Sequence, residues 1–328
     1  MSRLPLDTSL PFFAYGTLKS SELAFKQIEN YVAGQQPASL DDFELAVIDG
    51  LPRAFESKGE FVSGELLTLE PRAYEIIADF EQTPNIYKWT TGKTNLGTAN
   101  LVVYASDQIS TRHDKVSQWQ AADDTLLAEG IVWALRKLAT ARLFIQQNRS
   151  AASRTGQEAK FQFVELQATY SILWSIFERL TLFSEGPLLN GEKMLPRIQK
   201  LRRIDSWNEA VRKAAIDPNM GVRSSSNPHD RVTRGSSFGF EAWYKVRNNV
   251  IHRGKTADRE FGLVLRAAID LFRTLAFFIH DQSPSLRVFM DKNLTSAEKD
   301  LIFIGFTQSE LGRWEEENAT RNNGLPNT

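Results

Sequence analysis

Residues 13–18 read Phe13-Ala14-Tyr15-Gly16-Thr17-Leu18, an apolar strand that runs into a glycine turn. Further apolar segments follow at residues 43–48, 61–69 and 101–104, with glycine or proline between them. Short strands separated in this way are typical of a small strand-rich domain. A single helix is expected at residues 71–80, because proline is tolerated at the first position of a helix. Backbone N–H groups at the glycine turn can hold a carboxylate or an oxyanion.

The hydrophobic period changes after residue 110. Leucine and isoleucine recur at helical spacing from residue 126, and the pattern predicts an all-α bundle. Helices are expected at residues 126–148, 161–183, 195–216 in part, 240–252 and 262–279. The serine- and arginine-rich residues 223–237 are expected to form a loop. Thr295 and Glu298 have capping-box spacing and predict a terminal helix at residues 296–317. The predicted domains are residues 1–110, a connector with the first bundle helix at 111–160, the bundle at 161–285, and a C-terminal helix with a polar tail at 286–328.

Composition excludes several classes of protein. The 328 residues include no cysteine, so no disulfide framework, cysteine zinc site, iron–sulfur cluster or thiol nucleophile can form. The net charge of −1 conceals an asymmetry: residues 1–110 hold 8 Lys/Arg against 15 Asp/Glu, and residues 197–256 hold 13 against 5. The second segment is the part of the chain where binding of a polyanion would be favoured. Neither a signal peptide nor a run of eighteen apolar residues is found, so a cytoplasmic protein without a membrane span is expected.

Glu81 is the first candidate for chemistry. It lies just past the predicted helix at residues 71–80, where a single carboxylate can face a pocket, and Tyr87 follows six residues later. A solvated acid at a helix end is the commoner structural explanation for such a glutamate.

Together with Gly64-Glu65-Leu66-Leu67, these residues resemble the γ-glutamyl cyclotransferase-like family over roughly residues 10–106. The resemblance implies a small mixed α+β barrel in which Glu81 is the general acid/base. It implies that Tyr15, Gly16, Thr17, Leu18 and Tyr87 bind the substrate, a γ-glutamyl compound, with no metal and no cofactor. The substrate's own amine attacks its γ-carbonyl, so 5-oxoproline and an amine are released. The chain departs from the family at Leu67, Ala78 and Gln82, where the family usually has Tyr, Asp and Gly.

A second constellation lies at residues 243–254, Trp-Tyr-Lys-Val-Arg-Asn-Asn-Val-Ile-His-Arg-Gly. Asn248 and His252 are four residues apart and share a helix face. Arg247 lies within or beside an apolar stripe, where a guanidinium needs an anionic or hydrogen-bonding partner. Arg, Asn and His suit metal-independent RNA cleavage, because a histidine moves the proton and an arginine holds the phosphate. A histidine near a helix C-terminus is also favoured by the helix dipole alone.

This segment resembles the HEPN family, whose motif is an arginine followed by four to six residues and a histidine. The resemblance implies a helical bundle that dimerises to form a composite cleft. It implies an endoribonuclease that leaves a cyclic 2′,3′-phosphate, with Arg247 and His252 as the catalytic pair and Asn248 in support. Lys245, Arg253 and Lys255 are expected to line the path of the RNA phosphates.

Three functions follow as hypotheses. The first is an endoribonuclease effector in antiphage defence or a toxin system, which acts as a homodimer and is controlled by the N-terminal domain, with a cognate antitoxin as a possible partner. The second is a γ-glutamylamine cyclotransferase whose bundle serves dimerisation. The third is a protein that binds RNA or a γ-glutamyl ligand without turnover.

Overall fold

The computed structural model describes residues 2–105, 114–148, 156–185, 193–214, 221–223, 231–233, 239–253 and 257–323. Contacts divide the chain into two compact units. The first comprises Met1–Ala128, Arg179–Glu192 and Gln282–Leu286, and the second comprises Glu129–Glu178, Lys193–Asp281 and Arg287–Thr328. The domain boundaries expected at residues 110, 160 and 285 stay predictions.

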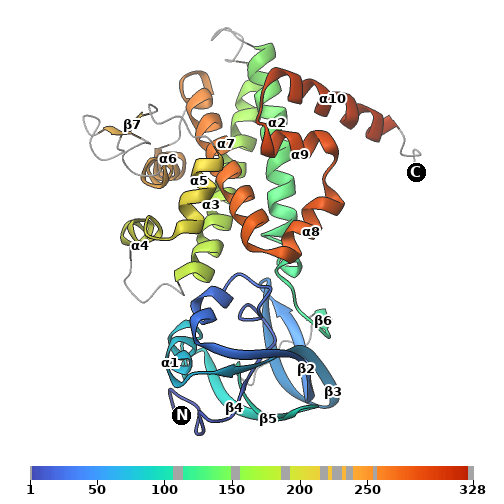
Figure 1. Cartoon of the computed structure of the whole chain (residues 1–328). Coiled ribbons are helices and arrows are strands. Elements are labelled where there is room, and N and C mark those ends of the chain that lie inside the picture. Colours follow the sequence, from blue (N-terminus) through green and yellow to red (C-terminus); the bar gives the residue numbers. More distant parts are fainter. Residues whose placement is uncertain are drawn as a thin grey trace. The chain divides into compact units, whose positions relative to one another are not determined.

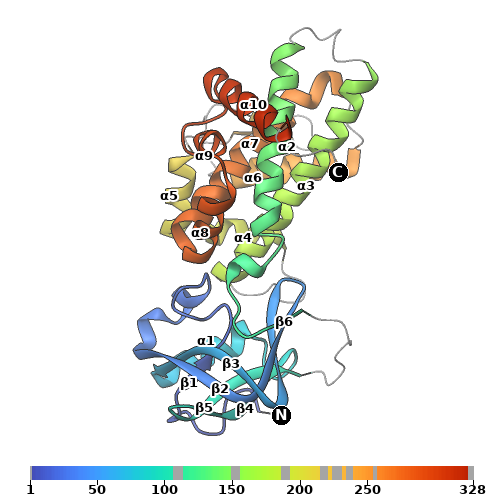
Figure 2. The same ribbon diagram turned by 90° about the vertical axis from the view of Figure 1, so that its right-hand side faces the viewer.

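One mixed sheet dominates the first unit. Its strands are β1 (Phe12–Ala14), β2 (Val32–Ile48), β3 (Leu51–Leu69), β4 (Tyr87–Thr94), β5 (Gly97–Tyr104) and β6 (Asp114–Val116). They follow the order β3-β1-β5-β4-β2-β6, and β2 also pairs with β3. That extra pairing closes five of the strands into a barrel-like sheet, to which β6 adds along β2 (Figure 1 and Figure 2). β1 and β5 run parallel and their other neighbours antiparallel, so the predicted small mixed barrel is confirmed.

The long hairpin of β2 and β3 extends well beyond the strands expected at residues 43–48 and 61–69. Ile48 pairs with Leu51, which leaves Asp49 and Gly50 as a two-residue turn with φ angles of 54° and 77°. Turns with two positive φ angles match the right-handed twist of the strands and favour the pair Asp-Gly. The hairpin therefore has a clear local signal, which the apolar segments alone did not reveal.

Helix α1 (Pro71–Phe80) has the predicted bounds. Its buried residues are Ala73, Tyr74, Ile77 and Ala78, which recur at helical spacing and form one face. The Tyr74 hydroxyl donates a hydrogen bond to the carbonyl of Leu10. Packing of this face holds the end of α1 in place, and the candidate acid Glu81 follows directly. Three short 3-10 helices complete the unit, at Phe25–Gln27, Glu29–Tyr31 and Ala121–Asp123.

The C-terminal region is helical, as predicted. Its elements are α2 (Ala128–Gln147), α3 (Gln157–Glu185), α4 (Met194–Leu201), α5 (Asp205–Lys213), a hairpin of β7 (Gly221–Arg223) and β8 (Arg231–Thr233), α6 (Phe240–Arg253), α7 (Ala257–Gln282), α8 (Pro284–Asn293), α9 (Ser296–Phe303) and α10 (Gln308–Asn323). Trp207 stacks on Phe278 with ring centroids 3.8 Å apart, and Phe177 stacks on Phe240 at 5.1 Å. These buried rings give the region a hydrophobic core of its own. Its identity as a HEPN bundle stays a prediction.

Three expectations for this region need correction. The terminal helix expected at residues 296–317 is two helices, because the chain turns at Gly305 with a φ of 132°, a conformation that favours glycine. The capping box at its start is confirmed, since the Thr295 side chain accepts from the Glu298 amide. The helix expected in part of residues 195–216 is divided into α4 and α5, and β8 falls inside the loop expected at residues 223–237.

Candidate functional site

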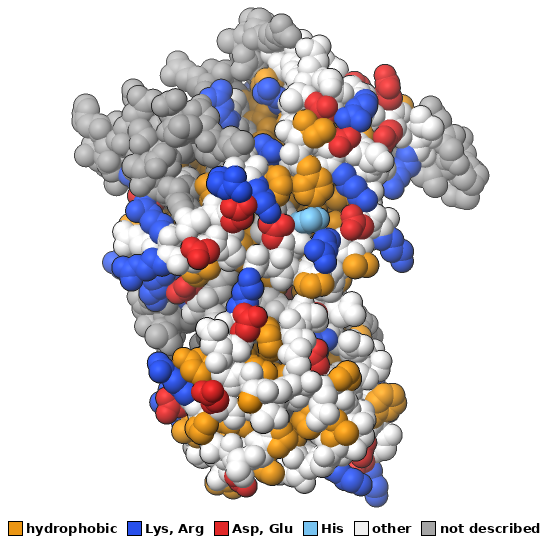
Figure 3. Space-filling view, viewed as in Figure 1, with side chains coloured by type: hydrophobic (Ala, Val, Ile, Leu, Met, Phe, Trp, Pro, Cys, Tyr) orange, Lys and Arg blue, Asp and Glu red, His pale blue; other side chains and the backbone are white. Residues whose placement is uncertain are grey.

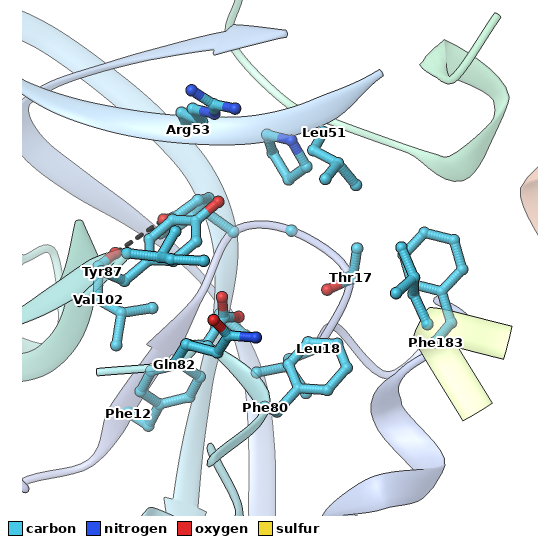
Figure 4. Close-up of a pocket in the computed structure, with 17 residues that line it drawn as sticks. Phe12, Thr17, Leu18, Leu51, Arg53, Phe80, Gln82, Tyr87, Val102 and Phe183 are labelled. Carbon is cyan, nitrogen blue, oxygen red and sulfur yellow. Dashed lines mark hydrogen bonds between the residues drawn. The ribbon is translucent and has the colours of Figure 1, made fainter. Parts of the chain in front are cut away.

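A cavity of about 250 Å³ opens in the first unit at one side of the barrel. Its wall is formed by β1 and the following loop at residues 12–18, the start of β3 at residues 51–53, the end of α1 with residues 80–82, residues 86–87 at the start of β4, Val102 of β5, and residues 182–183 at the end of α3. Figure 4 shows Phe183 and Leu51 on one side of the cavity and Tyr87 and Val102 on the opposite side. The volume lies near the lower end of the range for small-molecule sites.

The loop after β1 is held at both ends. The Tyr15 side chain is 5% exposed, and its hydroxyl donates a hydrogen bond of 2.7 Å to the carbonyl of Val102. Glu65 accepts from the Ser20 amide at 2.7 Å and from the Ser20 hydroxyl at 2.8 Å. A Cβ atom at Gly16 would lie 2.5 Å from Cγ of Pro52, so only glycine fits between the loop and β3.

The same loop offers backbone donors to the cavity. Within the described part of the chain, no residue accepts a hydrogen bond from the amides of Gly16, Thr17 or Leu18. Neighbouring N–H groups with no acceptor can together hold an anion. The expectation that residues 15–18 can hold a carboxylate or an oxyanion therefore has a structural basis, and their role stays a prediction.

Glu81 is the carboxylate of the cavity. Its backbone N–H donates to the carbonyl of Ile77 at 2.8 Å and ends α1, and the next residue, Gln82, has a φ of 52°. The chain thus takes a left-handed turn at Gln82, where the related family usually has glycine, the residue that adopts this conformation most easily. Burial raises the pKa of the Glu81 carboxyl from 4.5 to about 8. None of the described residues forms a hydrogen bond or salt bridge with this carboxyl, so it is available to a ligand.

Two tyrosines lie close enough to Glu81 to interact with its charge. Burial raises the pKa of the Tyr15 hydroxyl well above its usual value, and the charges of Tyr87 and Glu81 raise it further. Burial likewise raises the pKa of Tyr87, with Glu81 adding to the shift and Arg53 opposing it. Both hydroxyls therefore stay protonated at any physiological pH; Tyr15 donates its hydrogen bond to the carbonyl of Val102, and Tyr87 can act as a neutral hydrogen-bond donor.

Arg53 is a cavity residue that the sequence analysis did not identify. Its guanidinium lies 4.2 Å above the ring of Tyr104 and 3.7 Å from the carboxylate of Asp49. Its Nε is buried and has no acceptor among the described residues. A guanidinium with a free donor suits a carboxylate ligand. The signal available in the sequence was weak, since a single arginine in a predicted turn region is ordinary.

The structure therefore brings together all the residues that the N-terminal resemblance indicated: Tyr15, Gly16, Thr17, Leu18, Glu81 and Tyr87. It adds Arg53, Leu51, Leu182 and Phe183, of which the last two lie more than 90 residues away in sequence. A carboxyl with a pKa near neutral, beside donors for an anion, can bind an amino acid group and move a proton at its amine.

The second predicted site is described only in part. Arg247 and Asn248 lie on α6, where Nη1 of Arg247 donates to Oδ1 of Asn248 at 3.2 Å. Nε of Arg247 is buried without an acceptor among the described residues. His252 and Arg253 end the helix, but their side chains lie outside the described part, as does the whole of Lys255. Lys245 is half-buried on the same helix and engaged in an interaction.

The positive charge of residues 197–256 is partly neutralised by local ion pairs. Arg202 pairs with Glu241 at 2.9 Å, Arg212 with Glu209 at 2.5 Å, and Lys213 with Asp281 at 2.5 Å. On the face in Figure 3, the described basic and acidic side chains are interspersed. Glu209 and Glu241 are already counted in the net charge of this segment, so only the pair with Asp281 lowers that charge further, and the expectation of a nucleic-acid surface stays a prediction.

Comparison with known proteins identifies the first unit. Residues 12–121 match the model of a family described as gamma-glutamyl cyclotransferase, AIG2-like, so the N-terminal region is a domain of this kind. No curated protein matches the chain. Solved structures similar to the chain include an uncharacterized protein from Pyrococcus horikoshii (19% identity, TM-score 0.28, covering 34% of this chain and 89% of that one), an AIG2-like protein from mouse (19%, 0.30, 34% and 87%), and a protein from Arabidopsis thaliana (16%, 0.28, 46% and 89%).

Among the described residues, no group of three or more histidines and acids is placed to hold a metal ion. None of the described helices is both long and apolar enough to cross a membrane. The expectations of a metal-free and cofactor-free reaction, and of a cytoplasmic location, stay predictions.

Proposed function

We propose that the protein is a cyclotransferase that converts γ-glutamyl compounds into 5-oxoproline and a free amine. The observation that carries this proposal is the Glu81 carboxyl, with a pKa of about 8, in a cavity whose loop offers backbone donors. The match of residues 12–121 to a cyclotransferase family supports it independently.

The reaction follows from the groups that line the cavity. The ionised Glu81 accepts a proton from the substrate's α-ammonium group, and the neutral amine attacks the γ-carbonyl carbon of the same molecule. A C–N bond forms within a five-membered ring, and the negative charge on the carbonyl oxygen is stabilised by N–H donors of the loop at residues 16–18. Glu81 returns the proton to the leaving nitrogen as the original amide bond breaks. Atoms and charge balance without a cofactor, because attack is intramolecular and depends on positioning.

A neutral resting state of Glu81 fits this role. Near pH 7 the buried carboxyl is mostly protonated, since its pKa is about 8. A bound ammonium group favours the ionised form, because opposite charges in a partly dry cavity attract strongly. The substrate therefore creates its own general base when it binds.

The test is formation of 5-oxoproline from a γ-glutamylamide by the full-length protein. We expect Glu81→Gln to lower the rate by at least about 100-fold, the usual contribution of a general acid/base. The matched control is Glu75→Gln, an exposed residue on the same helix, which should leave the rate unchanged. Equal rates for Glu81→Gln and wild type would overturn the proposal.

A second candidate function is cleavage of RNA by α6, proposed on the basis of Arg247. Its Nε is buried with no acceptor in the described part of the chain, and Asn248 holds another nitrogen of the same guanidinium at 3.2 Å. A guanidinium fixed in this way suits a phosphate. Two copies of His252 would supply the two proton transfers, so this function requires a homodimer. A defence or toxin role would follow from that activity.

Its test is cleavage of total RNA by the purified protein in the presence of a chelator. Arg247→Ala and His252→Ala should abolish cleavage, whereas Lys299→Ala on α9 should not. Equal cleavage by wild type and both α6 variants would identify a contaminant and refute the hypothesis.

A further inference from the structure

The cavity of the first unit has one polar and one apolar side. Of the described residues that line it, Glu81 and Arg53 carry charge, and both interact with Tyr87. Figure 4 shows Leu18, Leu51 and Phe183 on the opposite side, with Thr17 between them, and Pro52 and Leu182 also line the cavity. A substrate that places its amino acid group against Glu81 must therefore direct the rest of the molecule toward hydrocarbon.

The apolar side is fixed in position. The carbonyl of Phe183 accepts from Nε2 of Gln27 at 3.0 Å, and the Phe183 side chain is 3% exposed. Leu51 directly follows the turn at Asp49–Gly50, and Arg179 donates to the Asp49 carbonyl at 2.5 Å. Arg179 is held in turn by Asp124, whose carboxylate lies 3.3 Å from its Nε. The two apolar walls therefore belong to anchored segments and form a defined surface.

We propose that the amine released by this protein is hydrophobic, so that its substrates are γ-glutamyl derivatives of aliphatic or aromatic amines. This inference rests on the proposed cyclotransferase function and specifies its substrate class. A charged or strongly polar amine would lose water on entering this side of the cavity, where the hydroxyl of Thr17 is the one described polar side chain that could replace it (Figure 4). An apolar amine gains free energy with each methylene group that leaves water.

Phe183 and Leu182 are the specificity-determining residues in this account. They lie at the end of α3, outside the residues 12–121 that match the family model. The segment at residues 179–192 nevertheless groups with the first unit. The apolar wall is thus built in part by a segment that the family domain itself does not supply.

The experiment compares three substrates: γ-glutamylmethylamide, γ-glutamylhexylamide and a γ-glutamylaminohexylamide whose chain ends in an ammonium group. For the full-length protein, kcat/KM for the hexylamide should exceed each of the others by at least about tenfold. Phe183→Ala should reduce the ratio of hexylamide to methylamide by about tenfold, because the contact surface for the chain is lost.

A second variant keeps the test decisive if Phe183→Ala does not fold. Leu182→Asp, at a half-buried position, should shift the preference toward the aminohexylamide, because the new carboxylate pairs with its ammonium group. The matched control is Val164→Ala, 60% exposed on the same helix, which should leave all ratios unchanged.

The outcomes separate the two proposals. Release of 5-oxoproline at equal kcat/KM from all three substrates would refute the hydrophobic amine and leave the cyclotransferase intact. A higher kcat/KM of the wild-type protein for the aminohexylamide than for the hexylamide would likewise refute the hydrophobic amine and leave the cyclotransferase intact. Release of 5-oxoproline from none of them would overturn both.

Discussion

Replacing Glu81 by glutamine should make the first unit more stable at alkaline pH. In the folded protein burial raises the pKa of this carboxyl to about 8, against 4.5 in an exposed glutamate. The folded state therefore holds the proton more tightly than the unfolded state. The contribution of Glu81 to the free energy of unfolding is therefore fully present below about pH 4.5 and is lost as the pH rises through about 8.

The size of the effect follows from the pKa difference. At about 1.4 kcal/mol per pH unit, the interval from 4.5 to about 8 corresponds to about 5 kcal/mol. Glu81 is partly exposed, and water at the cavity reduces the cost of ionising its carboxyl in the folded protein. We expect Glu81→Gln to be more stable than wild type by about 2–3 kcal/mol near pH 9 and about equal near pH 4.

The assay is urea unfolding at a series of pH values, followed by hydrogen exchange of peptides from β1 and β5 so that only the first unit is observed. Glu22→Gln is the comparison, because burial also raises the pKa of Glu22, to about 7. The gain in stability of Glu22→Gln over wild type should reach its full value at a pH about one unit lower than the gain of Glu81→Gln does. A free-energy difference between Glu81→Gln and wild type that does not change from about pH 4 to about pH 9 would refute the burial of an ionisable carboxyl at this site.

Three more outcomes are expected. The kcat/KM for a γ-glutamylamide should rise about tenfold per pH unit up to about pH 8 and then level, because it reports the ionisation of Glu81 in the free enzyme; a flat profile across about pH 6–8 would contradict this. Gly16→Ala should destabilise the first unit by about 1–3 kcal/mol in urea unfolding, because its Cβ would lie 2.5 Å from Pro52, and wild-type stability would refute the close contact. Thr295→Ala should cost the second unit about 1 kcal/mol through loss of the cap of α9, with hydrogen exchange of β1 unchanged as the control.

Local sequence signals predicted the elements around the site well. Pro71 at the first position indicated the start of α1, and the predicted bounds placed Glu81 just after its end. Gly16 marked the turn after the first strand, and the structure adds why glycine is needed there, since a Cβ would lie 2.5 Å from Cγ of Pro52. Period and capping likewise predicted the helical C-terminal region.

The other features of the site could not be predicted, because they depend on contacts between residues that are far apart in the sequence. Arg53 was missed because β3 begins at Leu51, well before the strand expected at residues 61–69. Phe183 also lines the cavity, although its helix was assigned to the bundle from its hydrophobic periodicity. Periodicity shows which face of a helix is apolar, but it does not show which segment covers that face. The charge of residues 197–256 also depends on distant residues, since Asp281 pairs with Lys213 from outside the counted segment, and the expected RNA partner stays a prediction.

Cyclisation of a γ-glutamyl group in the cavity around Glu81 gives different products from hydrolysis. The most direct measurement is the product of γ-glutamylhexylamide incubated with the full-length protein, analysed by mass spectrometry. Cyclisation predicts 5-oxoproline and hexylamine in equal amounts, with no free glutamate and with loss of both products in Glu81→Gln. Free glutamate in place of 5-oxoproline would show that water, and not the substrate's own amine, attacks the carbonyl, and would contradict the account.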